Sequence, residues 1–142
     1  MSDLIQEIVR LKTKVMFSVA STLTEAVPAG QAVKYNVVMT NVGGGFNVTS
    51  NEFVCPVSGY YKFDIHALTN GGGQFWLDLM QNGVVKASIH GAKDAFQGSS
   101  NSAVLRVERD DVVKVVAMNP SSLYDTGRQL YTTFNGVLLS VI

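Results

Sequence analysis

The chain has 142 residues, of which 46% are hydrophobic and 15% charged, and its 11 basic and 11 acidic side chains give a formal net charge of +0. This length suits a single domain with a sizeable core. Balanced charge gives no bulk attraction to nucleic acid, and no apolar run is long enough to cross a bilayer. We therefore expect no nucleic-acid partner and no membrane insertion.

In residues 1–15 the apolar side chains recur at alternating intervals of three and four residues, the a/d spacing of a coiled coil. These positions are Met1, Leu4, Ile8, Leu11 and Val15. Such a short helix is marginal in water by itself, so its apolar stripe needs a partner. The partner is either its own domain or the same helix in other copies. We favour a short coiled-coil-like bundle of residues 1–14, coupled to oligomerisation of a globular domain of residues 15–142.

From Val15 onward the hydrophobic period changes to two, which is typical of β-strands. The pattern predicts about ten strands: Val15–Ser21, Ala32–Met39, Gly45–Thr49, Glu52–Cys55, Tyr60–Thr69, Gln74–Gln81, Val84–His90, Ser102–Arg109, Val112–Met118 and Tyr131–Ile142. Asn82-Gly83 between two of these runs is the strongest hairpin signal in the chain. Many short, evenly spaced strands without an internal helix indicate an all-β sandwich.

The central strand of this interpretation is Tyr60–Thr69, which alternates strictly between apolar and polar residues. We expect its odd-numbered side chains, which include Tyr61 and Phe63, to face the core. The last strand differs because both of its faces are apolar, with Phe134 on one and Leu139 on the other. A strand buried on both sides needs a cover outside the sandwich. A loop would serve, but we favour a subunit interface.

Spaced aromatic residues, glycines and other small residues also resemble the signature of the C1q-domain family, which is related in fold to the tumour necrosis factors. The residues that carry the resemblance are Asn41, Gly43, Phe46, Phe53, Pro56, Gly59, Tyr61 and Phe63, followed by the closing Phe134-Asn135-Gly136-Val137-Leu138-Leu139. The resemblance narrows the sandwich to a jelly roll preceded by a short heptad helix. It also implies a compact homotrimer. We expect core or interface roles for Leu4, Ile8, Leu11, Tyr61, Phe63, Phe134 and Leu139.

The sequence shows no catalytic or metal-binding arrangement of its two histidines and one cysteine, so we expect no enzymatic activity and no required cofactor. Cys55 lies in an apolar run and should be a buried free thiol. In several members of the family a cysteine here pairs with one in the next strand, but the matching position looks like Trp76. Asp110 and Asp111 belong to the one acidic cluster, whose oxygens suit calcium. Some members of the family bind calcium near the trimer apex; the alternative is a solvated turn. Asp110 stands where the family usually has glycine.

Ligand recognition is expected in the two longest predicted loops, Gly91–Ser100 and Asn119–Arg128. Each combines an aromatic ring with charges of both signs, which suits stacking and hydrogen bonding to polyols or carboxylates. The candidate residues are Lys93, Tyr124, Asp125 and Arg128.

The resemblance implies a recognition protein whose ligands are glycans or microbial and cell-surface molecules. The short helix in place of a collagen-like repeat matches the stand-alone C1q-domain proteins, many of them lectin-like proteins of invertebrate innate immunity. The alternatives are a receptor-binding extracellular ligand of the cytokine or synaptic-organiser kind and a structural or matrix assembly protein. The chain begins without a signal-peptide pattern, so it is a mature form or an intracellular protein. We expect secretion.

Overall fold

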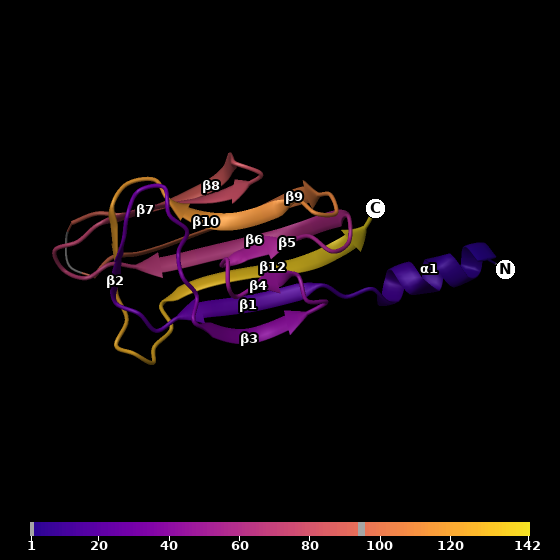
Figure 1. The fold of residues 1–142 in the computed structure, drawn as a ribbon, viewed down its shortest axis with the longest axis horizontal. Coiled ribbons are helices and arrows are strands. Elements are labelled where there is room, and N and C mark those ends of the chain that lie inside the picture. Colours follow the sequence, from indigo (N-terminus) through magenta and orange to yellow (C-terminus); the bar gives the residue numbers. More distant parts are fainter. Residues whose placement is uncertain (1, 94–95) are drawn as a thin grey trace.

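The computed structural model describes residues 2–93 and 96–142, and it shows two five-stranded antiparallel sheets packed face to face (Figure 1). The elements are α1 (Ser2–Lys12), β1 (Met16–Ser21), β2 (Glu25–Val27), β3 (Val37–Val42), β4 (Phe46–Asn47), β5 (Glu52–Val54), β6 (Gly59–Leu68), β7 (Phe75–Gln81), β8 (Val84–Gly91), β9 (Gly98–Val107), β10 (Val112–Ala117), β11 (Ser121–Leu123) and β12 (Thr132–Val141). The first sheet has the order β3-β1-β12-β6-β9 and the second β4-β5-β10-β7-β8. The predicted jelly-roll sandwich is confirmed.

The core lies between the sheets and is rich in aromatic rings. Phe17 is stacked on Phe53 with ring centroids 5.1 Å apart and meets the edge of Phe134 at 4.8 Å. Tyr61, Phe63 and Phe134 are completely buried within the chain, so they are core residues. Full burial of one such side chain contributes about 1.5–3 kcal/mol, and the offset ring contacts add to it.

The strict alternation of β6 is confirmed, because its odd-numbered residues are buried and its even-numbered residues face outward. The strand lies between β12 and β9 in the first sheet. Gly136 of β12 lies opposite Phe63, and a Cβ there would collide with the Phe17 ring and come within 2.9 Å of the Phe63 ring. A glycine at this position therefore lets the two aromatic rings approach the sheet.

The predicted Asn82-Gly83 hairpin is present, with β7 ending at Gln81 and β8 beginning at Val84. Both turn residues have positive φ, 49° and 81°, as a two-residue type I′ turn requires. The predicted strand Ala32–Met39 is wrong at its start, because β3 begins at Val37. Val33 and Tyr35 are buried as the alternation demands, but their amides bond the Val115 carbonyl and the Asn51 side chain instead of joining a sheet ladder.

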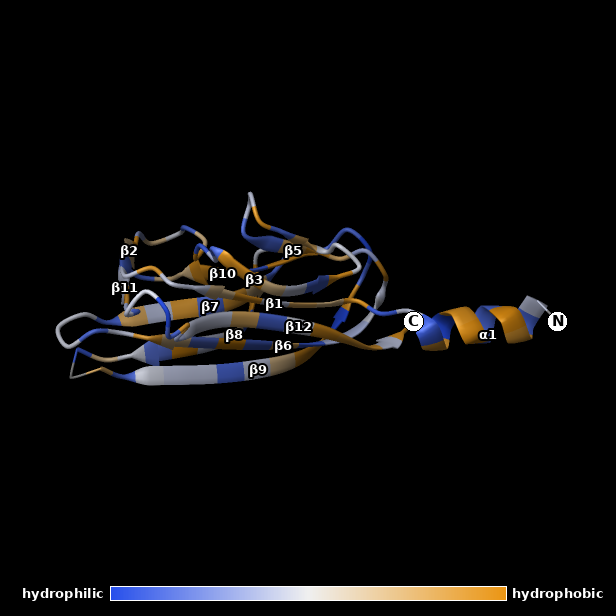
Figure 2. Ribbon diagram, turned by 90° about the horizontal axis from the view of Figure 1, so that it is seen from below, coloured by the Kyte–Doolittle hydropathy of each residue, from blue (hydrophilic) through white to orange (hydrophobic). Residues whose placement is uncertain are grey.

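The helix α1 projects from one end of the sandwich, next to the C-terminus (Figure 1), and none of its residues is buried. Its apolar side chains are 42–70% exposed, and Figure 2 shows them alternating with polar residues along the helix. The Arg10 guanidinium donates to the Val141 carbonyl at 3.2 Å, which links the helix to the end of β12. The alternative of a helix buried against its own domain is therefore not observed. Within the described residues, no helix combines the length and the apolar composition needed to cross a membrane.

Candidate recognition site

Two loops lie at the end of the sandwich opposite α1: one joins β8 to β9 and the other joins β11 to β12 (Figure 1). Both are held by the end of β6, because the Tyr124 amide donates to the Leu68 carbonyl and the Thr69 amide donates to the Gln97 carbonyl, each at 3.0 Å. The structure therefore brings together the two loops that the sequence predicted as separate candidates.

Both loops are shorter than predicted. The expected loop Asn119–Arg128 contains β11, which pairs with β2 in a small two-stranded sheet. The expected loop Gly91–Ser100 ends at Gly98, where β9 begins its pairing along β6. Asp94 of this loop lies outside the described residues. The pairing of β11 with β2 and of β9 with β6 therefore anchors each loop at one of its ends.

An aromatic cluster joins the loops. The Tyr124 ring lies 5.0 Å from Phe96 in an edge contact and 6.3 Å from Tyr131 in a near-parallel one. Phe96 is exposed, whereas Tyr124 and Tyr131 are partly buried. The sequence pointed to Tyr124 but not to the contribution of Tyr131. An exposed ring supported by two others gives a flat apolar surface on which a sugar or another ring can stack.

Asp125 is buried, and its carboxylate is bonded to the backbone of its own loop. It accepts hydrogen bonds from the amides of Gly127, Gln129 and Tyr131 at 2.7–3.2 Å. Burial alone would raise the pKa of this carboxyl, but the amide donors outweigh it and hold the pKa below the ordinary value. Thus Asp125 fixes the shape of the loop, while Tyr124 reaches its surface.

Lys93 and Arg128 are exposed on these loops. In the part of the chain that the structure describes, the Arg128 guanidinium forms no hydrogen bond or ion pair. A solvated arginine can bind a carboxylate or phosphate in bidentate fashion without first breaking an internal contact. The two residues supply positive charge on the same two loops as the aromatic cluster.

The acidic turn between β9 and β10 is held together internally. The Asp111 carboxylate accepts from the Asn82 and Gln81 amides at 2.9 and 3.2 Å and from the Glu108 backbone amide at 2.9 Å. The Asn82 hydrogen bond lowers the pKa of Asp111. Asp110 adopts the left-handed conformation, with φ of 73°, so the turn keeps the backbone shape that glycine would favour. Among the described residues, no three acidic, histidine or cysteine side chains are grouped to hold a metal ion, and a calcium site at Asp110 and Asp111 stays a prediction.

Cys55 is a buried free thiol, as predicted. Its Sγ lies 3.1 Å from the Val57 carbonyl, and burial raises its pKa. A buried thiol held in its neutral form is a poor nucleophile.

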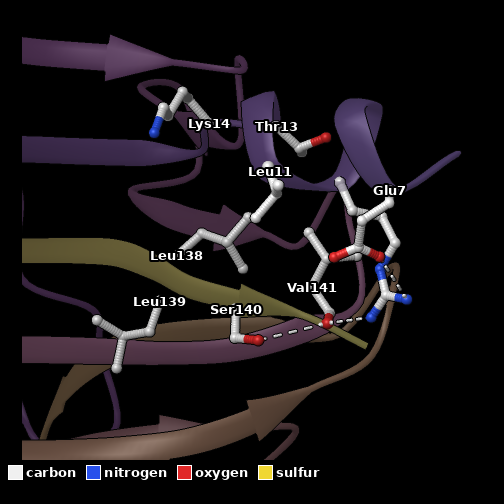
Figure 3. A pocket seen from close by; sticks show the side chains of 9 residues that line it. Glu7, Leu11, Thr13, Lys14, Leu138, Leu139, Ser140 and Val141 are labelled. Carbon is white, nitrogen blue, oxygen red and sulfur yellow. Dashed lines mark hydrogen bonds and ion pairs between the residues drawn. The ribbon is translucent and has the colours of Figure 1, made fainter. Parts of the chain in front are cut away.

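A second surface lies at the opposite end of the molecule, beside α1. The outward face of the first sheet carries exposed apolar side chains there, interrupted by Lys62 between Val137 and Val104 and by Arg106 opposite Tyr60. We call the apolar members the apolar end; they are Met16, Val42, Tyr60, Val104, Val137 and Leu139. The side chain of Leu139 is 56% exposed. A groove of about 180 Å³ continues this surface onto the helix, where Leu11 approaches Leu138 and Val141 (Figure 3). The groove also contains Glu7, Arg10 and Lys14, so the helix stripe and the apolar end are neighbouring apolar surfaces with charged residues at their junction.

Comparison with known proteins places this architecture in a family. Residues 16–139 match the family described as the C1q domain. A chain of the complement C1q subcomponent from Rattus norvegicus is 32% identical over 116 residues, which cover 78% of this chain and 45% of that protein. Its counterpart from Bos taurus is 29% identical over 114 residues, with the same coverage. The chain therefore spans less than half the length of these relatives.

Solved structures agree with this assignment. The globular domain of a zebrafish complement 1qA protein superposes with a TM-score of 0.77 and 27% identity, covering 91% of this chain and 100% of that one. Murine APRIL at pH 5.0 gives a TM-score of 0.71 with 12% identity, covering 89% of this chain and 100% of that one. At that identity the second likeness concerns the fold alone.

Proposed function

The chain belongs to the C1q domain family, and from this premise we propose that it is a homotrimeric, lectin-like recognition module for glycans on microbial or cell surfaces. A C1q-type domain is a non-enzymatic recognition or ligand module, and domains of the C1q and tumour necrosis factor type typically form trimers. Relatives with this domain are typically secreted, so we further propose an extracellular role in innate immunity.

Support for a trimer comes from the apolar surface beside α1. Leu4, Ile8 and Leu11 lie on the exposed stripe of a helix too short to be stable alone. The stripe adjoins the apolar end of the first sheet, so one arrangement of copies can cover both. Exposed apolar side chains gathered at one end of a domain favour an interaction site there.

Support for glycan binding comes from one observation above all, the aromatic cluster that joins the two loops. Phe96 and Tyr124 present a stacking surface at the end of the sandwich farthest from α1. Lys93 and Arg128 add positive charge on the same two loops, and Asp125 keeps the loop in shape. Together these groups suit a sugar that carries a carboxylate or another acidic substituent. In a trimer, three such sites would face the same way, and a multivalent surface would bind far more tightly than free sugar.

The test compares two arginines on an immobilised glycan panel. Arg128→Ala should lose about tenfold to a hundredfold in affinity, because a charge-assisted contact contributes about 1.5–3 kcal/mol. Arg109→Ala is the matched control, since Arg109 is also exposed but lies in the turn after β9, at the other end of the strand from the loops. Both variants are first checked for wild-type oligomeric state.

Equal binding by both variants, or equal losses, would contradict the loop assignment. Failure of every glycan, combined with saturable binding to cells, would favour a receptor-binding ligand instead. Growth of particles beyond a trimer with rising concentration would favour a matrix assembly protein.

A further inference from the structure

The outward face of the second sheet carries a compact group of four side chains, close to the point where β8 leads into the β8–β9 loop. Trp76 lies directly opposite His90 on β7 and β8, and Asp78 lies directly opposite Ser88. Their neighbours Phe75, Leu77 and Leu79 are buried in the core, so alternation puts Trp76 and Asp78 on the outer face. We call these four residues the Trp76 cluster.

Trp76 offers a partly open aromatic surface. Its side chain is 38% exposed, and its ring centroid lies 5.0 Å from that of His90. On the other side, β10 is followed by Met118, whose amide donates to the Trp76 carbonyl at 2.9 Å and whose own side chain is exposed. The indole is therefore held between neighbours while part of it remains in contact with solvent.

Asp78 is unusual because it is a carboxylate on an outer sheet face that is nevertheless only 4% exposed. Its Oδ1 accepts the hydroxyl of Ser88 at 2.5 Å. Its Oδ2 has no hydrogen-bond partner within residues 2–93 and 96–142, yet it is not one of the polar atoms sealed from solvent. A nearly dehydrated acceptor with one oxygen unused gains more from an incoming donor than a fully solvated carboxylate does.

From this arrangement we propose that the Trp76 cluster is a separate binding site for a neutral sugar ring. The C–H face of the sugar stacks on the Trp76 indole, and a hydroxyl group donates to Oδ2 of Asp78. The Ser88 hydroxyl donates its proton to Asp78 and keeps acceptor capacity, whereas the His90 ring combines a donor and an acceptor; together they match adjacent sugar hydroxyls.

The charges on this face decide between a sugar and a cation. An ammonium or guanidinium group needs acceptors alone, whereas the cluster supplies donors as well. Lys114 also lies on this outer face, opposite Met80 and two residues before Val116, which pairs with Asp78. Its positive charge disfavours a cationic ligand and leaves a neutral ring unaffected. The site is on the second sheet, so it requires neither the loop site nor the apolar end.

Because Trp76 is the only tryptophan of the chain, its fluorescence reports on this site directly. The full chain is titrated with the methyl glycosides of glucose, galactose, mannose and N-acetylglucosamine, to about 50 mM. We expect a saturable change with at least one of them, with a Kd on the order of millimolar, as ligand efficiency predicts for a molecule of this size. Asp78→Asn should weaken binding about tenfold, the loss of one charge-assisted contact. Arg109→Ala should leave it unchanged.

Trp76→Leu is a second test variant. Because Trp76 is partly exposed, its substitution should destabilise the fold less than a substitution of the buried Asp78. Saturation-transfer NMR on the sugar protons should lose its signal in this variant, while thermal melting shows that the protein is folded. No saturable change with any glycoside, or an undiminished NMR signal in Trp76→Leu, would overturn the proposal. A saturable response to tetramethylammonium without a response to sugars would overturn it in favour of a cation site. If the loops do not bind glycans, the Trp76 fluorescence and NMR responses to methyl glycosides are still expected. The loop proposal and the Trp76 proposal can therefore be refuted independently.

Discussion

Substituting Leu139→Asp should abolish the proposed trimer while leaving each protomer folded. Leu139 is 56% exposed on the single chain, close to a register shift in β12 that separates Leu138 from Ser140. It fills no space in the core, so the change should alter the free energy of unfolding of the protomer by less than about 0.5 kcal/mol. All of its effect is then expected on assembly.

The magnitude follows from what the interface would bury. Covering the exposed half of a leucine is worth about 1 kcal/mol, and an unpaired carboxylate in its place costs about 3–5 kcal/mol more. With three copies per trimer, the association free energy would fall by on the order of 12 kcal/mol or more. A loss of that size removes the trimer at any practical concentration.

Sedimentation equilibrium at micromolar concentration separates the two states, because the protomer has a mass of 15.3 kDa and the trimer three times that, 45.9 kDa. Val48→Asp is the matched control: Val48 is 55% exposed but follows β4 at the edge of the second sheet. The reasoning is refuted if the wild-type chain sediments as a monomer, or if Leu139→Asp remains a trimer. Circular dichroism of the variant must show the same strand content as the wild type.

Three further predictions concern single features of the fold. Removing residues 1–14 should leave a folded trimer that dissociates at higher concentration in light scattering, because the sandwich offers the larger surface; a wholly monomeric product would mean that the helices drive assembly. Asp125→Asn should lower the free energy of unfolding by about 2 kcal/mol at pH 7. Since the folded pKa of Asp125 is lowered, its charge stabilises the fold above the unfolded pKa of about 4. The deficit should therefore shrink as chemical denaturation is repeated at lower pH, and a deficit independent of pH would refute the charge argument. Gly136→Ala should cost about 1–3 kcal/mol, because its Cβ would collide with the ring of Phe17, and an unchanged melting temperature would show that the ring can move aside.

The strands that the sequence revealed are those whose pattern depends on a sheet with one covered face. In β6 every second side chain is buried in the core, so apolar residues recur with a period of two in the sequence. The β7–β8 hairpin was equally clear, because Asn82 and Gly83 must both accept positive φ. These signals are local, so they can be recognised without knowing which distant segment each strand pairs with.

Other strands depend on partners far away along the chain. β2 and β11 have three residues each and pair only because the fold brings Val27 next to Ser121. The start of β9 reads Gly-Ser-Ser-Asn-Ser, which suggests a loop, yet it pairs with β6 from Gly98 onward. Ser100 and Ser102 lie on the outward face beside His66 and Asp64, where the sheet does not demand hydrophobic residues. Asn101 lies on the inner face beside Ile65, and its side-chain amide donates to the Ser88 carbonyl of the second sheet.

The candidate site shows the same division. Composition located the recognition loops but could not distinguish the roles within them. In the sequence, Asp125 and Arg128 are both polar loop residues. In the structure, the Asp125 carboxylate accepts hydrogen bonds from three backbone amides, whereas Arg128 is exposed to solvent. Trp76 was noted only as the residue at a family cysteine position. Its pairing with His90 depends on the register of β7 and β8, which composition does not specify.

The layout of the two ends has a practical consequence for how the protein can be tethered. Both α1 and the C-terminal end of β12 leave the sandwich at one pole, and the loops with Phe96 and Tyr124 occupy the other (Figure 1). An 11-residue helix adds a spacer of about 16 Å at the first pole. A biotin or fluorescent tag fused at either terminus would therefore sit on the far side from the loops. A biosensor chip coated in this way would present the loop pole of every molecule to the sample.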